Sequence, residues 1–318
     1  MGGDNGSKAT VEAIKNFLKN NDDVQVIAVG RKEELKELEG LCEIVDAPDV
    51  VPMTAGALDV LRMKNSSMMV ALNLLKQGKG DGVISCGSTG GFLASATITL
   101  KMLPGVKRAA LVTSFPMQTK GKYLTVCDCG ANNENNPEEL YQFAWMGQLY
   151  SKYVCNIEDP RVYLLSNGGE DEKGSPLVKE TNKLFREKNF PNFQGNIEAR
   201  EAVLDPKVDV VVCDGFNGNI FLKAVEGTAK YMSKLMKEAF LLNLSTKIGY
   251  LFAKKGVKGI SKQMDYKSVG GALLLGVNGI VVKAHGNSDA YGFESAMKIV
   301  KRMAKANILE KIKEGIAQ

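Results

Sequence analysis

Three loops of this chain combine glycine with hydroxyl, carboxylate or amide side chains, and each follows an apolar, strand-like run. They cover residues 85–91, 128–132 and 214–219. Glycine lets a backbone approach a ligand closely, and a helix that begins at such a loop presents free NH groups to an anion. Because the carboxyl ends of neighbouring parallel strands can gather several loops around one crevice, the pattern predicts an enzyme that acts on a phosphate group.

His285 is the only histidine in the chain, and it follows a valine-rich, strand-like run. A histidine at the end of a strand can move a proton or donate a hydrogen bond to a reacting oxygen, but a lone histidine can also be structural. Both interpretations stay open on the residues alone. The chain has no Gly-x-Ser-x-Gly elbow and no Gly-x-x-x-x-Gly-Lys-Ser/Thr loop, so neither motif supplies the chemistry.

Composition favours a cytosolic globular protein without a metal site or cofactor. The chain has 318 residues, of which 44% are hydrophobic and 24% charged, enough for one large domain over 1–318 or two intimately joined lobes. No apolar run is long enough to span a bilayer, and the amino-terminal residues have no signal-peptide pattern. Most of the six cysteines lie in or beside apolar runs, where a thiol behaves as a small hydrophobic group.

The elements that must position these loops alternate along the chain. We expect helices at 8–19, 32–38, 55–63 and 68–76, and strands at 24–29 and 43–45. Such alternation predicts an α/β fold, a three-layer α/β/α sandwich with a mostly parallel sheet.

Two pairs of strand-like runs look antiparallel instead. Residues 111–115 lead through a short loop into 123–128, and 272–277 meet 280–284 across Asn278-Gly279, a strong hairpin dipeptide.

A basic amphipathic segment covers residues 228–267. It contains nine lysines but only two acidic residues, and its apolar residues recur at helical spacing on both sides of a break near Asn243. We expect two basic helices that lie on an anionic membrane surface or receive an acidic protein. An interface between subunits with a lysine-rich solvated face is the alternative.

Seven segments in order carry a resemblance to a known family. They are residues 1–5, 85–91, 128–132, 169–174, 195–198, 214–223 and 283–286. Over essentially its whole length the chain resembles the PlsX family of acyl-carrier-protein:phosphate acyltransferases. The resemblance implies a fold similar to phosphate acetyltransferases and to the isocitrate/isopropylmalate dehydrogenase type.

The resemblance also implies the reaction and its partners. A fatty acyl group would pass from the thioester of acyl carrier protein to inorganic phosphate, giving an acyl phosphate for phospholipid synthesis, which a glycerol-3-phosphate acyltransferase would consume. A homodimer is implied, in the cytoplasm with peripheral contact at the inner face of the membrane; no nucleic acid is expected. A thioester is already activated, so positioning and oxyanion stabilisation suffice without a cofactor or metal.

Two positions differ from the family pattern. In the family the Met-Gly-Gly-Asp segment follows a first strand, whereas here it begins the chain, so either a strand is missing or the true start lies upstream. Ser88 stands where the family has asparagine, and its hydroxyl can still bond phosphate.

These considerations assign roles to fifteen residues. The expected catalytic residues are His285, Asn217, Asn219, Asp214 and Lys223; the expected substrate-binding residues are Asp4, Asn5, Gly87, Ser88, Thr89, Gly90, Asp128, Asn132, Lys173 and Lys283. The 87–90 loop would hold phosphate with a lysine as countercharge. His285 and the two catalytic asparagines would stabilise the oxyanion, or His285 would protonate the departing thiolate. The two aspartates would orient donors, because a carboxylate repels phosphate.

Three other functions fit the same residues. A phosphate acetyl- or butyryltransferase that uses coenzyme A is the nearest, and a decarboxylating dehydrogenase would share the fold class. A regulatory module that binds nucleotide or membrane without catalysis is the third.

Overall fold

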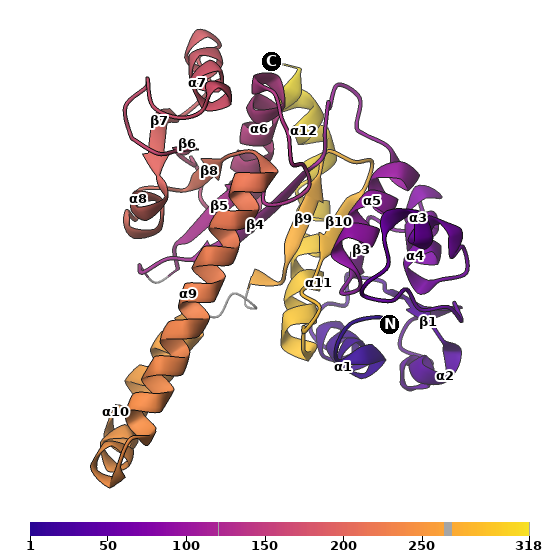
Figure 1. The fold of residues 1–318 in the computed structure, drawn as a ribbon. Coiled ribbons are helices and arrows are strands. Elements are labelled where there is room, and N and C mark those ends of the chain that lie inside the picture. Colours follow the sequence, from indigo (N-terminus) through magenta and orange to yellow (C-terminus); the bar gives the residue numbers. More distant parts are fainter. Residues whose placement is uncertain (120, 264–268, 318) are drawn as a thin grey trace.

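A computed structural model describes residues 1–119, 121–263 and 269–317 (Figure 1). In these residues the strands form one sheet of eight and one of two. In spatial order the large sheet contains β3 (Gly82–Ser85), β10 (Ile280–Lys283), β9 (Ala272–Leu275), β4 (Ala110–Pro116), β5 (Tyr123–Cys127), β8 (Val210–Val212), β6 (Val162–Ser166) and β7 (Phe193–Glu198). The small sheet pairs β1 (Ile27–Gly30) with β2 (Glu43–Asp46) in parallel. The fold is therefore α/β with a mostly parallel, mixed sheet.

Strand direction reverses in the middle of the large sheet. β3 runs parallel to β10, β9 is antiparallel to both β10 and β4, and β4 is antiparallel to β5. β5, β8, β6 and β7 then run parallel to one another. The carboxyl ends of β3 and β10 thus lie at one end of the sheet, which we call the histidine end. Those of β5, β8 and β6 lie at the opposite end, which we call the aspartate end.

Helices cover both faces of the large sheet, so its strands are apolar on both sides. Along β8, Val210 and Val212 point into one hydrophobic cluster and Val211 into the other. The first face packs against α1 (Gly6–Leu18), α6 (Pro137–Val154), α7 (Pro176–Glu187), α11 (Ala290–Lys305) and α12 (Ile308–Ile316). The second packs against α3 (Ala57–Arg62), α4 (Ser67–Lys76), α5 (Thr89–Leu100), α8 (Ala199–Leu204) and α9 (Gly215–Leu241). Two short helices, α2 (Lys32–Leu35) and η1 (Lys36–Leu38), connect β1 to β2.

Both predicted antiparallel pairs are confirmed. β4 pairs with β5 over 112–116 and 123–127, whereas β9 pairs with β10 only over 272–274 and 281–283, fewer residues than the sequence indicated. The predicted strand at 24–29 begins only at Ile27. A local turn such as Asn278-Gly279 fixes the pairing of adjacent strands, whereas the length of a strand depends on its distant neighbours.

The basic segment forms two antiparallel helices that project from the body of the molecule (Figure 1). α9 begins at Gly215, well before the predicted start, and α10 (Leu244–Gln263) follows the expected break at Asn243. Lys267 and Asp265, part of the same predicted segment, lie outside the described residues. No helix within the described parts of the chain has the length and hydrophobicity that crossing a bilayer requires.

Two glycines dock the first turn of α9 against the loop that follows β5. A Cβ added at Gly215 would lie 2.2 Å from the carbonyl oxygen of Asn132, and one at Gly218 would lie 1.9 Å from that of Asp128. These atoms belong to backbone and cannot move aside alone. From this contact α9 crosses the sheet, and Phe221 packs against Phe115 of β4 with ring centroids 6.0 Å apart.

We expect Gly218→Ala to destabilise the fold by at least about 2 kcal/mol, because the added methyl group overpacks a contact between two backbones. Gly227→Ala is the matched control, since a Cβ at Gly227 in the same helix meets no atom within 4 Å. That change should raise stability by about 0.5–1 kcal/mol through helix propensity. Chemical denaturation of both variants measures the difference, and equal midpoints would contradict this account of how α9 docks.

Candidate active site

The amino-terminal residues are fixed against the loops at the histidine end. The NH of Asp4 donates to the carbonyl oxygen of Gly286 at 2.8 Å, and Asn5 Nδ2 donates to the carbonyl oxygen of Ser288 at 2.9 Å. A Cβ added at Gly3 would lie 2.6 Å from Cys86 Sγ. The exposed Asp4 side chain is thereby held beside the residues that follow β3 and β10.

The loop after β3 leads into the amino terminus of α5. Ser88 caps this helix: its Oγ accepts from the NH of Gly91 at 3.3 Å and donates to the carbonyl oxygen of Ala55 at 3.0 Å. The Ser88 hydroxyl is buried and both bonds are internal to the protein. Thr89 and Gly90, the first two residues of α5, are exposed. NH groups at this position have no partner within a helix, so they and the helix dipole face any anion placed there.

Lys283 is a buried cation at the same end of the sheet. It lies on β10, is only 6% exposed, and its Nζ donates to the carbonyl oxygen of Ala284. Burial lowers the pKa of Lys283 from 10.5 to about 8, the nearby Asp4 carboxylate opposes this shift, and the Lys223 ammonium adds to it. The Lys283 ammonium therefore loses its proton at a lower pH than an exposed lysine does.

Lys223 and His285 complete the group at the histidine end. α9 carries Lys223 across the sheet from the aspartate end, and its exposed ammonium lies 2.7 Å from a carboxylate oxygen of Glu226. His285 follows β10 and is half-buried. Lys283 and His285 thus lie on the strand next to β3, whose loop leads into α5, and Lys223 is close enough to Lys283 to lower its pKa.

At the aspartate end, Asp128 organises its own loop. The carboxylate is fully buried and accepts hydrogen bonds from the NH groups of Leu111, Gly130, Ala131 and Asn132, at 2.9–3.2 Å, and from Asn132 Nδ2 at 2.9 Å. Burial raises the pKa of Asp128, although these donors oppose the shift. Asn132 Nδ2 also donates to the carbonyl oxygen of Ala109 at 2.8 Å. The loop is held by its own aspartate, as expected of a residue that orients donors.

Asp214 has the same task at the start of α9. Its carboxylate accepts from the NH of Asn217 at 2.9 Å and from Asn217 Nδ2 at 2.7 Å. The exposed Asn219 lies against the loop after β5, where its Cγ is 3.5 Å from a Cβ position at Gly130. Lys173 is exposed in the loop after β6, also at this end.

The predicted residues therefore fall into two groups at opposite ends of the sheet. The histidine end brings together Asp4, Asn5, Gly87, Ser88, Thr89, Gly90, Lys223, Lys283 and His285. The aspartate end holds Asp128, Asn132, Lys173, Asp214, Asn217 and Asn219. The expectation that all three glycine loops surround one crevice is wrong, because β9 and β4 reverse the sheet between β3 and β5.

Cys86 and Ala55 contribute to the histidine end without having been predicted. The Cys86 thiol lies under Gly3, and Ala55 receives the Ser88 hydroxyl. The position of Cys86 directly after β3 was a usable signal, whereas nothing near Ala55 in sequence indicates its contact. Among residues 1–119, 121–263 and 269–317, no three His, Cys, Asp or Glu side chains gather as metal ligands.

Comparison with known structures shows the same fold in phosphotransacetylases and a phosphotransacylase. A phosphotransacetylase from Streptococcus pyogenes superimposes with a TM-score of 0.60 at 17% identity, covering 94% of this chain and 93% of that one. A branched-chain phosphotransacylase from Enterococcus faecalis gives a TM-score of 0.59 at 14% identity, covering 95% and 96%. At such low identity the likeness concerns the fold alone.

Sequence comparison is more specific. A phosphate acyltransferase from Thermodesulfovibrio yellowstonii is 38% identical over 325 residues, covering all of this chain and 93% of the relative. One from Clostridium botulinum is 41% identical over 323 residues, covering 99% and 96%. The family model described as "Fatty acid synthesis protein" matches residues 1–311. The chain therefore belongs to this fatty acid synthesis (PlsX) family and is a phosphate acyltransferase.

Proposed function

We propose that the enzyme transfers a fatty acyl group from acyl carrier protein to inorganic phosphate at the histidine end of the sheet. The observation that carries this proposal is the juxtaposition of a buried lysine, Lys283, with a half-buried histidine and the exposed amino terminus of α5. The lysine can offset the charge of phosphate, the histidine can protonate the departing thiolate, and the amino terminus of α5 can bind phosphate oxygens. The reaction requires all three. The product, an acyl phosphate, would serve phospholipid synthesis in the cytoplasm.

Phosphate binds where positive charge and free donors meet. The NH groups of Thr89 and Gly90 donate to its oxygens, and the Lys283 ammonium offsets its charge inside the protein. Lys223 adds a second, exposed cation. Ser88 contributes through the helix that it caps, because its hydroxyl already bonds Gly91 and Ala55.

Transfer replaces a carbon–sulfur bond with a carbon–oxygen bond. A phosphate oxygen attacks the thioester carbonyl carbon, the carbonyl oxygen becomes an oxyanion, and collapse of this intermediate expels the carrier's thiolate. His285 supplies the proton that converts the thiolate to a thiol, which is favourable because free thiols ionise only above about pH 8. The residues need only position the reactants, since the thioester is already activated.

The projecting pair α9 and α10 provides a surface for an acidic partner. Lys254, Lys255 and Lys258 are exposed on α10, and Phe252 beside them is 86% exposed. Lysines would attract the acidic carrier protein, and the apolar side chains would be buried on binding. The same helices could join two copies as a homodimer or lie on an anionic membrane, so the tests below measure all three associations.

A comparison of acyl donors tests the proposed substrate. We expect acyl phosphate to form from palmitoyl-carrier protein and phosphate, with a kcat/KM at least tenfold above that for palmitoyl-coenzyme A. The opposite preference would assign the chain to transferases that use coenzyme A. If neither donor supports phosphate-dependent turnover, only the non-catalytic binding module remains, and the proposal is overturned.

The pH dependence tests the role of Lys283. Below its pKa of about 8 the side chain is a cation, and above it the charge is lost. We expect kcat/KM for phosphate to fall as pH rises through about 8, and Lys283→Arg to keep it constant to pH 9 because arginine stays protonated. Lys283→Met should raise KM for phosphate more than tenfold at pH 7. A wild-type profile that stays level to pH 9.5 would exclude this role.

Paired substitutions test which end of the sheet holds the reaction. His285→Gln should lower kcat about 100-fold with little change in KM, because a proton donor acts on the leaving group in the transition state. Asn219→Ala, at the aspartate end, should change kcat only a few-fold. If Asn219→Ala loses as much turnover as His285→Gln, the aspartate end takes part in catalysis and the site must be redrawn.

Charge reversal tests the α10 surface. Changing Lys254, Lys255 and Lys258 to glutamate should weaken binding of carrier protein or anionic vesicles at least tenfold at low salt, with a smaller effect at high salt. Glutamates at Lys64, Lys76 and Lys179, exposed on other helices or loops, make the same charge change as a control. A monomeric α10 variant would identify a dimer interface, and unchanged binding to both partners would make these lysines a solvated face.

A further inference from the structure

The loop that follows β10, residues 284–288, turns three successive carbonyl groups toward one short segment of the chain; we call it the histidine loop. The carbonyl oxygen of Gly286 accepts from the NH of Asp4 at 2.8 Å. Those of Asn287 and Ser288 both accept from Asn5 Nδ2, at 3.2 and 2.9 Å. Two adjacent residues from the other end of the chain therefore hold the backbone of the histidine loop.

Asn5 stands directly before α1, where an asparagine ordinarily caps the helix with its own side chain. Within the described residues it forms no such cap bond, and its backbone, at φ −94° and ψ 5°, is not in the extended conformation typical of a capping residue. Its amide nitrogen donates to two carbonyl oxygens of the histidine loop instead. An amide has two hydrogens, so both are used on this loop.

The same short segment also contacts the loop after β3. A Cβ added at Gly3 would lie 2.6 Å from Cys86 Sγ and 3.2 Å from the carbonyl oxygen of Gly286, so Gly3 lies between the loops after β3 and β10. These strands are parallel neighbours, and both loops start at the histidine end. The segment therefore connects the loop that leads into α5 with the loop that carries His285.

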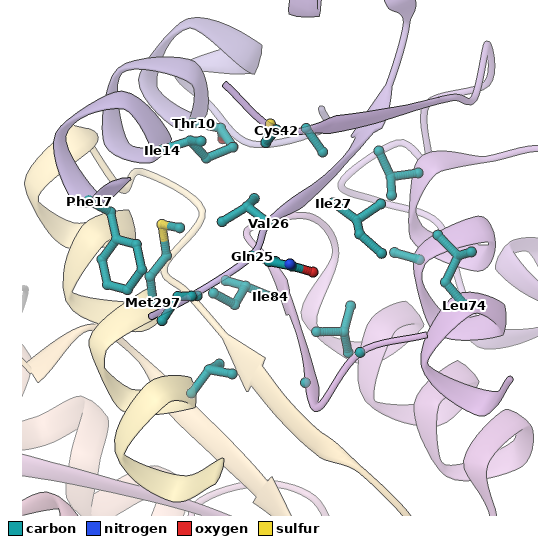
Figure 2. Close-up of a pocket in the computed structure, with 18 of the residues that line it drawn as sticks. Thr10, Ile14, Phe17, Gln25, Val26, Ile27, Cys42, Leu74, Ile84 and Met297 are labelled. Carbon is teal, nitrogen blue, oxygen red and sulfur yellow. The ribbon is translucent and has the colours of Figure 1, made fainter. Parts of the chain in front are cut away.

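β3 and β10 lead to helices on opposite faces of the sheet. α5, after β3, packs on the second face, and α11, after β10, packs on the first. In open sheets, ligands bind between the loops of two such strands. α1 packs along α11, and Figure 2 shows Phe17 of α1 and Met297 of α11 on the same wall of a pocket. Asn5 is thus attached to a helix that is itself fixed on the α11 side.

We propose that Asn5 is a positioning residue that fixes His285 relative to the amino terminus of α5. This inference rests on the proposed function, in which α5 binds phosphate and His285 protonates the departing thiolate. The proton donor must lie within hydrogen-bond reach of the leaving sulfur while phosphate attacks, so the relative position of the two loops affects the rate. Because both amide hydrogens of Asn5 bond the protein, Asn5 acts through His285 and not by donating to the substrate.

Two substitutions of Asn5 test this role through turnover. Asn5→Asp keeps the shape but sets carboxylate oxygens against carbonyl oxygens, and Asn5→Ala removes both hydrogen bonds without adding a charge, so it serves if Asn5→Asp does not fold. We expect each to lower kcat with palmitoyl-carrier protein about tenfold and to change KM for phosphate less than about twofold. Asn287→Asp is the matched control and should keep the wild-type kcat, because Asn287 is exposed in the same loop and its side chain forms no hydrogen bond with any described residue.

A double-mutant cycle with His285→Gln separates positioning from general damage. If Asn5 acts through His285, adding Asn5→Ala to His285→Gln should lower kcat less than about twofold further. Effects that multiply in the double variant, or a wild-type kcat in Asn5→Ala, would refute the positioning role. A nearly normal kcat in His285→Gln alone would contradict the proposed function instead, so the two failures are distinguishable.

The single histidine allows a measurement that does not depend on turnover. A chain with one histidine gives one imidazole Cε1–H signal in nuclear magnetic resonance, and its order parameter reports motion of the His285 ring. We expect this order parameter to fall by about a third in Asn5→Ala and to keep its wild-type value in Asn287→Asp. An unchanged value in Asn5→Ala, in a chain whose melting temperature shows that it is folded, would overturn the proposal even if kcat falls.

Discussion

The reversal of strand direction at β9 and β4 is the constraint on which the site depends. A doubly wound parallel sheet would bring the loops after all of its strands to one end. Here β9 is antiparallel to β10 and to β4, and β4 is antiparallel to β5, so β3 and β10 finish at one end of the sheet and β5, β8, β6 and β7 at the other. The same residue pattern, an apolar run followed by glycine and a polar side chain, consequently serves two purposes. After β3 it opens a helix terminus to solvent, and after β5 and β8 it packs helix against loop.

The packing role leaves a clear mark on side chains. Asp128 and Asp214 both direct their carboxylates to NH groups of their own loops, and the glycines at the start of α9 sit against backbone oxygens. At the histidine end, by contrast, Thr89 and Gly90 are exposed. Lys283 is buried there, and no carboxylate of the described residues forms a salt bridge with it. Burying a charge is expensive, and a buried lysine with a lowered pKa is therefore a candidate for a functional role.

Local chemistry predicted much of the fold, and long-range pairing decided the rest. Asn278-Gly279 predicted the β9–β10 hairpin, and helical spacing with a break at Asn243 predicted the projecting pair. The prediction that the three loops surround one crevice was wrong, because no local signal in β5 or β8 indicates that these strands run opposite to β3. The burial of Lys283 was equally hidden, since it results from helices packed on both faces of β10. The contact of Ser88 with Ala55 joins residues 33 positions apart and left no trace in the sequence.

α9 connects the two ends of the sheet and the exposed surface in one rigid element. A helix of 27 residues is about 40 Å long, so it can begin at the Asp128 loop, pass Phe115 and still extend beyond the body. The packing of its first turn at Gly215 and Gly218 fixes the direction of the whole helix. It therefore also fixes where Lys223 lies. Lys223, in the third turn of α9, lies between the docked first turn and the part of the helix that projects from the body.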